Sequence, residues 1–235
     1  MEIDMNKKPL NKKNYGSIGH LPCSRMGSGD HKITEGQSRI ATEKPRDKHD
    51  LIIVQEKLDG SNVGVALVDS KIFALTRAGY EAHTSPYEMH HQYDEWVKEN
   101  ESRFRSVLKE GQRICGEWLT HAHGTIYDLP HEPFVAFDLI DEKNKRYTYD
   151  NFIDLVGESF VVPKLINKGE PISVEYAMEF LGDFGFHGAQ EKIEGAVWRV
   201  ERKGIVDYLC KYVRPDKVDG KYLDGDQILN TWVNP

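Results

Sequence analysis

The chain has 235 residues, of which 39% are hydrophobic, enough for the core of one large domain or two small ones. Its net charge of −7 argues against a protein that coats nucleic acid without regard to sequence, because such proteins usually carry a positive total. It does not exclude an enzyme that grips a nucleic-acid end in a small basic groove. No run of about 18 apolar residues occurs, and the start MEIDMNKKPLNKK lacks the apolar middle of a signal peptide, so we expect a cytoplasmic protein.

The charge and the cysteines are distributed unevenly. Residues 1–50 carry 10 Lys and Arg against 7 Asp and Glu, so this segment is at +3 and the remainder at −10. Any phosphate-binding surface must therefore be local. Cys23, Cys115 and Cys210 are odd in number and far apart, which favours reduced thiols over a disulfide framework or a zinc site.

The first 50 residues are rich in glycine and show little periodicity, so we expect a polar arm of loops packed on a larger domain. Neither a repeat nor a low-complexity linker divides the rest. We therefore expect one compact domain over residues 51–214 and a short tail over residues 215–235.

Strand-like runs follow the arm. LIIV, NVGVALV and KIFALTR, with turn residues Asp69 and Ser70 between the last two, predict an antiparallel meander. Apolar residues at helical spacing predict one amphipathic helix over residues 91–108. The runs RICGEWL and PFVAFDLI predict two further strands.

Two shorter helices and a final hairpin complete the pattern. We expect one helix over residues 150–156, ended by Gly157, and another over residues 174–184, capped by Ser173. The second helix should present one apolar face, formed by Ala177, Phe180, Leu181 and Phe184. The runs IEGAVWRVE and IVDYLCKYV predict strands joined by a tight turn at Lys203-Gly204. The whole is an α+β pattern of antiparallel β-sheets with flanking helices.

A lysine in the stretch VQEKLDGSNVGVA, residues 54–66, stands where a strand meets a glycine turn. Strand alternation puts Lys57 and Asp59 on the same side, and Gly60 permits a ligand to approach the backbone. Such a turn suits a lysine aimed into a cleft, although the triplet by itself is weak evidence.

Further charged residues lie within apolar, strand-like runs. These are Glu117 in CGEW, Asp138 in AFDL, Glu194 in IEGAV and Lys211 in LCKYV. Charged residues rarely occupy such contexts without partners. Each one taken separately also fits a solvent-facing position, but their joint occurrence favours a site.

The order Lys-x-Asp-Gly, Arg, Gly-Glu, Phe-Asp, Glu-Gly-x-Val, Lys resembles the motif set of ATP-dependent RNA ligases. The likeness covers residues 52 to about 214, and EKLDGSN looks like the first motif of the RNA ligase 2-like branch. These enzymes belong to the covalent nucleotidyltransferase superfamily, with DNA ligases and mRNA capping enzymes. The resemblance implies a minimal catalytic domain with an ATP-grasp-like nucleotidyltransferase (ligase adenylation) fold. It also implies ATP and Mg²⁺ or Mn²⁺ as cofactors, and 5′-phosphate and 3′-hydroxyl ends of RNA, or of DNA, as partners.

The resemblance assigns roles to individual residues. Lys57 would attack the α-phosphate of ATP and form a lysyl-AMP intermediate, with Asp59 and Lys211 beside it in the catalytic set. AMP would then pass to a 5′-phosphate end and be displaced by a 3′-hydroxyl. The nucleotide-binding set would be Glu56, Arg77, Glu117, Phe137, Glu194, Lys211 and Arg214. In this set Phe137 stacks on adenine, Arg77 lies near the ribose and Lys211 contacts the α-phosphate. Glu194, with Glu117, would hold the metal.

Physical chemistry agrees with these roles. A free lysine has a pKa of about 10.4, so holding it neutral at pH 7 costs about 4.6 kcal/mol. Nearby cations such as Lys211 and Arg77 disfavour the ammonium form, and the same cations stabilise charge that gathers on the phosphate. Magnesium prefers the oxygen ligands that Glu194 and Glu117 supply.

The sequence departs from the family pattern at its end. The last motif usually reads Lys-x-Lys, whereas Lys211 is followed by Val213 at the second lysine position and then by Arg214. Arg214 suits phosphate and is a candidate replacement, but it cannot act as a neutral acid. The tail is too short for another domain. We therefore assign nucleic-acid binding to the arm, with Arg25, Arg39 and Lys44 as main candidates beside Lys32, Arg46 and Lys48; a solvated polar loop is the alternative.

Other interpretations stay open. A DNA ligase or a capping-type nucleotidyltransferase shares the chemistry, and a non-catalytic module that binds nucleic-acid ends shares the fold. His121 and His123 have metal-ligand spacing, but no third ligand accompanies them, which favours a structural or surface role. Trp96 and Trp118 are expected in the core or in a cleft wall.

Overall fold

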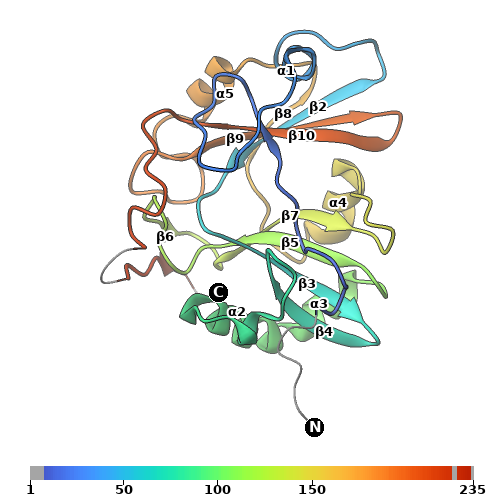
Figure 1. Ribbon diagram of the computed structural model, residues 1–235, viewed down its shortest axis with the longest axis vertical. Helices are drawn as coiled ribbons and strands as arrows, with labels where there is room; N and C mark the ends of the chain where they lie inside the picture. The colour runs from blue at the N-terminus through green and yellow to red at the C-terminus, as the bar shows by residue number, and fades with distance from the viewer. Residues whose placement is uncertain (1–7, 224–226, 234–235) are drawn as a thin grey trace. The chain divides into compact units, whose positions relative to one another are not determined.

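The structure is a computed structural model that describes residues 8–223 and 227–233. Parts of the predicted arm and tail, residues 1–7, 224–226 and 234–235, lie outside the described residues. The chain forms two compact units (Figure 1). The first unit contains the residues up to Gly16, Ser61–Thr120 and Pro133–Val162, and the second contains Ser17–Gly60, His121–Glu132 and the residues from Pro163 onward.

The second unit is built on a sheet of strand order β1-β10-β9-β2-β8. The strands are β1 (Gly19–His20), β2 (Asp50–Lys57), β8 (Leu165–Gly169), β9 (Gly195–Arg202) and β10 (Ile205–Val213). All neighbouring pairs are antiparallel except β1 with β10. The predicted hairpin of β9 and β10 is confirmed, and its turn residues Lys203 and Gly204 have φ of 51° and 75°. Two positive φ values are what a tight turn between twisted strands requires.

The first unit contains a sheet of strand order β4-β3-β5-β7. Its strands are β3 (Ser61–Val68), β4 (Lys71–Thr76), β5 (Arg113–Trp118) and β7 (Phe134–Ile140), as the sequence predicts. The turn at Asp69 and Ser70 has φ of 49° and 60°. The two turn N–H groups donate to the Glu110 carboxylate over 2.6 Å and 3.1 Å, which satisfies backbone donors that the hairpin leaves unpaired.

The predicted meander is wrong at its first strand. β2 pairs with β8 and β9, whereas β3 and β4 belong to the sheet of the first unit. The segment Leu58–Gly60 between β2 and β3 has no strand pairing. Local alternation predicts each strand but does not decide its partners.

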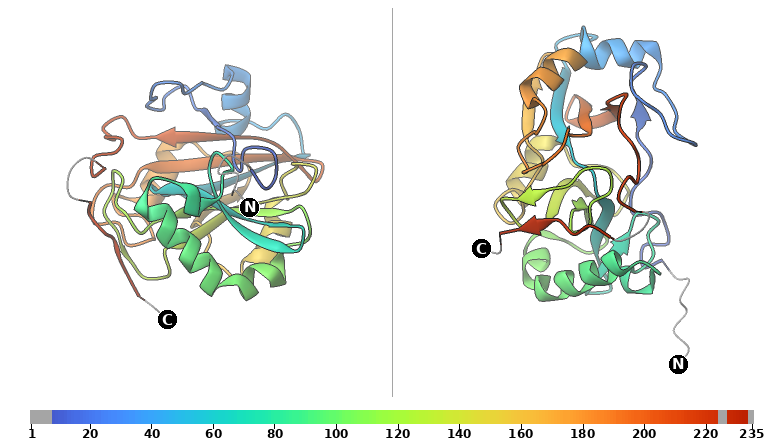
Figure 2. Two further views of the ribbon diagram at one scale, coloured as in Figure 1. Left: turned by 60° about the horizontal axis from the view of Figure 1, so that its bottom comes forward. Right: turned by 90° about the vertical axis from the view of Figure 1, so that its left-hand side faces the viewer.

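The single helix predicted over residues 91–108 is two helices, α2 (Glu88–Glu99) and α3 (Glu101–Val107). Asn100, at φ −102° and ψ 15°, leaves the helical region, and its side-chain amide donates to the Trp96 carbonyl at 2.9 Å. Asparagine favours helix ends because its side chain competes for backbone hydrogen bonds. Both helices pack beside β4 (Figure 2).

The core of the first unit is aromatic. Trp118, Tyr93, Phe104 and Phe134 are buried, and Trp96 packs against them, so the predicted core role of both tryptophans is confirmed. Helix α4 (Tyr149–Val156) packs beside β7 and ends at Gly157, as predicted. A short 3₁₀ helix, η1 (Ala82–Thr84), precedes α2.

The prediction that residues 1–50 are only loops is wrong. Besides β1 they contain helix α1 (Glu35–Thr42), which begins at a capping box: the Thr34 hydroxyl accepts from the Gln37 N–H, and the Gln37 side chain accepts from the Thr34 N–H. The motif T-x-x-Q was the available sequence signal. The edge strand β1 is too short for periodicity to reveal.

Helix α5 (Val174–Leu181) ends before the predicted residue 184, at Gly182 with φ 61°. Ser173 caps it as predicted, accepting from the Tyr176 N–H at 3.2 Å. The predicted apolar face is only half right: Ala177 and Leu181 are buried, but Phe180 and Phe184 are exposed.

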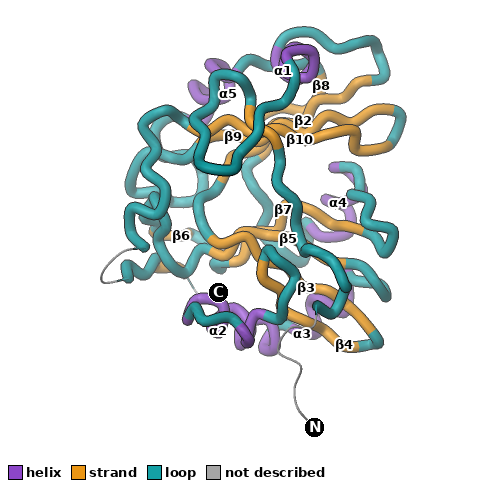
Figure 3. The backbone as a smooth tube through the Cα atoms, in the orientation of Figure 1, coloured by secondary structure: helices purple, strands orange, loops and turns teal. Residues whose placement is uncertain are grey.

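The connections 119–133 and 182–194 are mostly loop (Figure 3). Short strands β6 (Asp128–Leu129) and β11 (Thr231–Trp232) pair within this part of the second unit. Among the described residues, we find no helix with the length and apolar character needed to cross a membrane.

Candidate active site

Lys57 is the last residue of β2, and its amine contacts Glu194 and the backbone of Leu58 within the second unit. Nζ lies 2.7 Å from Glu194 Oε2 and donates to the Leu58 carbonyl at 3.1 Å. The lysine side chain is 19% exposed and the glutamate side chain 10%. The amine is thus partly shielded from water and directly paired with a carboxylate that the sequence placed in the same site.

The sheet register places Lys211 on the same face as Lys57. Lys57 pairs with Gly195 on β9, and Val197, two residues further along β9, pairs with Lys211 on β10. Paired residues, and residues two apart in a strand, share a face. A Cβ atom at Gly195 would collide with the Tyr212 carbonyl, so only glycine fits opposite Lys57.

Asp59 is buried two residues after Lys57, where the chain leaves β2. Its Oδ2 accepts from the Gly124 N–H at 2.8 Å and contacts the Lys217 ammonium, and its own N–H donates to the Tyr127 hydroxyl at 3.2 Å. Two segments distant in sequence therefore fix the turn after the candidate nucleophile.

Glu194 lies among these charges. Burial raises the pKa of its carboxyl; Lys57 and Lys217 oppose that shift and Asp59 adds to it. Burial also lowers the pKa of His123, on which the charges of Asp59, Lys217 and Lys57 act as well. The site thus contains two carboxylates and two lysines in a poorly hydrated environment, where electrostatic interactions are strong.

Lys211 has an anionic partner from the N-terminal segment. Its Nζ lies 4.0 Å from Asp30 Oδ1, and His20 Nε2 lies 3.1 Å from Asp30 Oδ2. β1 brings this segment alongside, because His20 pairs with Lys211 in the sheet.

Arg214 is engaged elsewhere. Its Nε donates to the Ile193 carbonyl at 2.7 Å, Nη2 to the Lys192 carbonyl at 3.2 Å, and Nη1 pairs with Asp216 at 2.7 Å. Nε and Nη2 therefore hold the strand end to the loop before β9, and Nη1 is engaged by Asp216 in the segment after β10. Val213, at the usual second lysine position, is buried.

Glu56 faces the opposite side of the sheet from Lys57. It is 2% exposed, and its Oε2 accepts from the Phe186 N–H at 3.0 Å. Burial raises the pKa of Glu56 to about 7, although the bond from Phe186 and the charge of Lys164 act against the shift. The structure therefore does not bring Glu56 to the face that carries Lys57.

Three predicted nucleotide-binding residues belong to the first unit. Arg77 follows β4 and is exposed, Glu117 lies on β5 opposite Val135, and Phe137 lies at a bulge of β7. The half-buried Phe137 ring packs edge-to-face on Tyr15, with ring centroids 5.1 Å apart. Bulges re-aim side chains out of the strand alternation, which is how a ring in mid-strand stays partly exposed.

Asp138, which the sequence placed among the buried charges, has a structural environment. It is fully buried, accepts from the Arg146 Nε at 2.7 Å and from the Tyr15 hydroxyl at 3.1 Å. These contacts tie Tyr15 to the sheet of the first unit.

The candidate nucleic-acid-binding residues Arg25, Arg39 and Lys44 differ in their surroundings. Arg25 pairs with Asp219 at 2.7 Å. Arg39, in the last turn of α1, and Lys44, just after it, are exposed.

The sequence reasoning missed Lys217, Tyr127 and Gly124. Lys217 follows a proline turn in a polar tail, and Tyr127 and Gly124 lie in a connection without periodicity, so no sequence pattern marks them. Only their contacts with Asp59 identify them.

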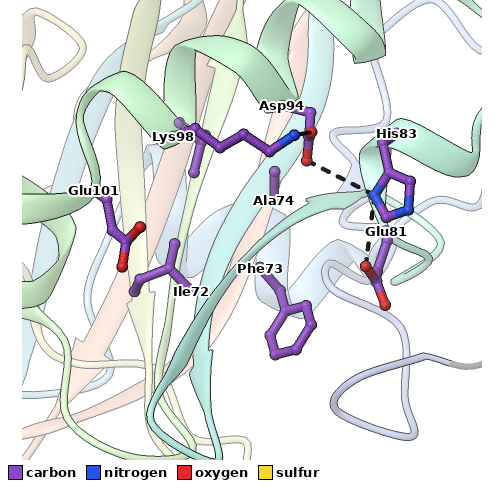
Figure 4. A pocket seen from close by; sticks show the side chains of 9 residues that line it. Ile72, Phe73, Ala74, Glu81, His83, Asp94, Lys98 and Glu101 are labelled. Atoms are coloured by element: carbon purple, nitrogen blue, oxygen red, sulfur yellow. Dashed lines mark ion pairs between the residues drawn. The ribbon is translucent and has the colours of Figure 1, made fainter.

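A separate pocket of about 300 Å³ lies in the first unit (Figure 4). His83 lies between Glu81 and Asp94, at 3.5 Å and 3.9 Å, and Asp94 also pairs with Lys98. The pocket contains none of the motif residues. Within the described residues, no group of three or more His, Cys, Asp or Glu side chains is arranged to hold a metal ion.

The antiparallel sheets with flanking helices form an α+β fold, as expected. A family model described as RNA ligase matches residues 50–213. The chain therefore belongs to the RNA ligase family.

Solved structures agree on the fold. An RNA ligase of Naegleria gruberi, solved with ATP and Mn, is 16% identical with a TM-score of 0.54, over 86% of this chain and 61% of that one. A putative ATP-dependent DNA ligase from Aquifex aeolicus is 17% identical with a TM-score of 0.52, over 85% of this chain and 49% of that one. The chain thus spans about half to three fifths of these solved proteins. No protein of curated function is significantly similar to it in sequence.

Proposed function

We propose that the chain is an ATP-dependent RNA ligase that carries AMP on Lys57. The observation that carries this proposal is the pairing of Lys57 with Glu194 at 2.7 Å, on a sheet face shared with Lys211, in a chain of the RNA ligase family. AMP would pass from Lys57 to a 5′-phosphate end, and a 3′-hydroxyl would then displace it and join the ends.

The residues of the site have distinct tasks in this reaction. Lys57 needs a free amine to attack the α-phosphate, so its proton must leave. Glu194 Oε2 is in hydrogen-bond contact with that amine, so the carboxylate takes this proton and releases it before it binds a metal ion. Lys211 supplies a positive charge for the phosphate, on which negative charge gathers as the bond to pyrophosphate breaks.

The site offers a carboxylate ligand for a divalent metal ion. Mg²⁺ is commonly bound by one or two carboxylates together with substrate phosphates, and the buried Glu194 carboxylate provides such a ligand. When bound, the metal would offset the charge of the phosphate oxygens. Glu117, on β5 of the first unit, remains the second proposed ligand.

The direct test is incubation with α-labelled ATP and Mg²⁺ or Mn²⁺. We expect a labelled protein band in the unaltered chain and no band in Lys57→Ala, because the alanine has no nucleophile. Lys57→Arg retains a charge at this position but not a usable amine, so it should also be unlabelled. Label that persists in Lys57→Ala would contradict the assignment of the nucleophile.

A DNA ligase is the second candidate, favoured by the structural likeness to the Aquifex aeolicus protein. Nicked duplexes of RNA, of DNA and of both strand types, each with 5′-phosphate and 3′-hydroxyl ends, distinguish the two. Joining of DNA alone would replace the RNA proposal. Binding of ends without adenylation would indicate the non-catalytic module, and labelling with GTP in place of ATP would indicate a capping-type enzyme.

A further inference from the structure

Lys217 is a buried lysine close to the candidate nucleophile. Its side chain is 1% exposed, and its ammonium contacts Asp59, two residues after Lys57. Removing an ammonium from water costs several kcal/mol, which its partners must offset. The family match ends at residue 213, so it does not include this lysine.

The surroundings of the Lys217 amine are closely fitted. Asp59 Oδ2, which contacts the amine, also accepts from the Gly124 N–H at 2.8 Å. A Cβ atom at Gly124 would collide with the Lys217 amine and with the Val218 carbonyl. The position of the amine thus depends on a glycine in a loop that is otherwise irregular.

The same amine belongs to the charge cluster of the candidate site. Glu194, which pairs with Lys57, also experiences the charges of Asp59 and Lys217. Arg214, the candidate replacement for the second lysine of the last motif, has all three guanidinium nitrogens engaged with Lys192, Ile193 and Asp216. The described structure therefore offers a different cation for that role.

We propose that Lys217 is a phosphate-binding residue of the adenylation reaction, taking the place of the lysine that Val213 and Arg214 do not supply. The inference rests on the proposed function. Asp59 holds the Lys217 ammonium beside the site, and the ammonium turns to a phosphate oxygen of the nucleotide when Lys57 attacks. The free amine of Lys57 forms the bond to the α-phosphorus and loses a proton to water, and pyrophosphate leaves with the electron pair of the broken phosphoanhydride bond. Lys217 contributes positive charge without transferring a proton.

The test compares Lys217→Met with Lys221→Met in single-turnover formation of lysyl-AMP from α-labelled ATP with Mg²⁺. Lys221 lies in the same segment and pairs with Glu191 at 2.6 Å, so it is a charge-matched control outside the site. Loss of a preorganised donor to a developing charge costs about 10²- to 10³-fold in rate. We expect a loss of that order for Lys217→Met at saturating ATP and an unchanged rate for Lys221→Met.

A purely structural role for Lys217 makes a different prediction. If the lysine only neutralises Asp59, then Lys217→Met has no further effect once Asp59 is Asn. We therefore measure Lys217→Met in both backgrounds, as a double-mutant cycle. A rate loss in the Asp59→Asn background supports phosphate binding, and its absence overturns it. The double variant removes both buried charges, and thermal unfolding checks that it folds.

Binding of ATP, measured in the Lys57→Ala background so that no adenylate forms, gives a second comparison. Lys217→Met should weaken ATP binding whether residue 59 is Asp or Asn. If Lys217→Met leaves the affinity for ATP unchanged in both backgrounds, the inference is overturned. Normal adenylation by Lys217→Met contradicts this inference alone. Absence of lysyl-AMP in the unaltered chain contradicts the proposed function itself.

Discussion

Glu56 and Lys57 are neighbours in sequence with opposite surroundings. Strand alternation directs Lys57 to the face that carries Lys211 and directs Glu56 to the other face, against Phe186. The carboxyl of Glu56 also has one buried oxygen, Oε1, without a hydrogen-bond partner. An ionised carboxylate in that position is poorly solvated, so its protonated form is favoured.

This burial predicts a pH dependence of stability. The pKa of Glu56 is raised from 4.5 to about 7 in the folded chain. The folded state therefore binds this proton more tightly than the unfolded state does. The resulting stabilisation is complete below pH 4.5 and is lost as the pH rises through about 7.

Glu56→Gln keeps the shape and removes the titration. Urea unfolding from pH 5 to pH 8 should show that the variant gains stability relative to the unaltered chain as the pH rises. The gain is at most roughly 3 kcal/mol, because the pKa of Glu56 rises from 4.5 to about 7. Glu170→Gln, at an exposed position, should leave the pH profile unchanged. A Glu56→Gln difference that is constant with pH would contradict the assignment.

At the scale of the element, the helix starts offer a matched comparison. Thr34 begins α1 and Thr148 begins α4, but only Thr34 makes a capping hydrogen bond with its side chain. The sequence signals the difference, because Gln37 stands three residues after Thr34 whereas Asn151 stands at the corresponding place after Thr148.

Thr34→Ala should therefore destabilise the chain by about 1 kcal/mol, the usual effect of losing an N-cap. Thr148→Ala makes the same chemical change without removing a cap bond, so its effect should be smaller. Denaturant unfolding of both variants measures the free energy of unfolding. Equal losses would show that the Thr34 cap contributes nothing specific.

At the scale of the whole molecule, the net charge of −7 requires that binding to nucleic acid be local. The proposed contact is the segment before β2. Arg39 and Lys44 are exposed there, whereas the pair with Asp219 reduces the charge that Arg25 can offer.

The double variant Arg39→Ala/Lys44→Ala should weaken binding to a nicked RNA duplex. If each side chain contacts a phosphate, the slope of log K against log salt should fall by about 2, since each contact contributes about 0.9. Fluorescence anisotropy over a range of salt concentrations measures this slope. The control Lys143→Ala/Lys145→Ala removes two exposed lysines of the first unit. If the control lowers the slope equally, the assignment of nucleic-acid binding to the segment before β2 is contradicted.

The sequence by itself determined the strands of six or more residues, the two tight turns, and the residues Lys57 and Glu194 that the structure pairs. Alternation, turn residues and charges in apolar runs are local properties, so a segment of a few residues is enough to recognise them. The family resemblance rested on the same residues, and the match over residues 50–213 agrees with it.

Only the tertiary structure decided which strands share a sheet and which distant side chains meet. In the structure β2 belongs to a different sheet from β3 and β4, and Glu56 faces away from Lys57. The Arg214 guanidinium is bound to the loop before β9. Lys217 and Tyr127 both contact Asp59. These outcomes depend on register and on long-range packing. A pattern within one segment carries no information about the segment that will cover it.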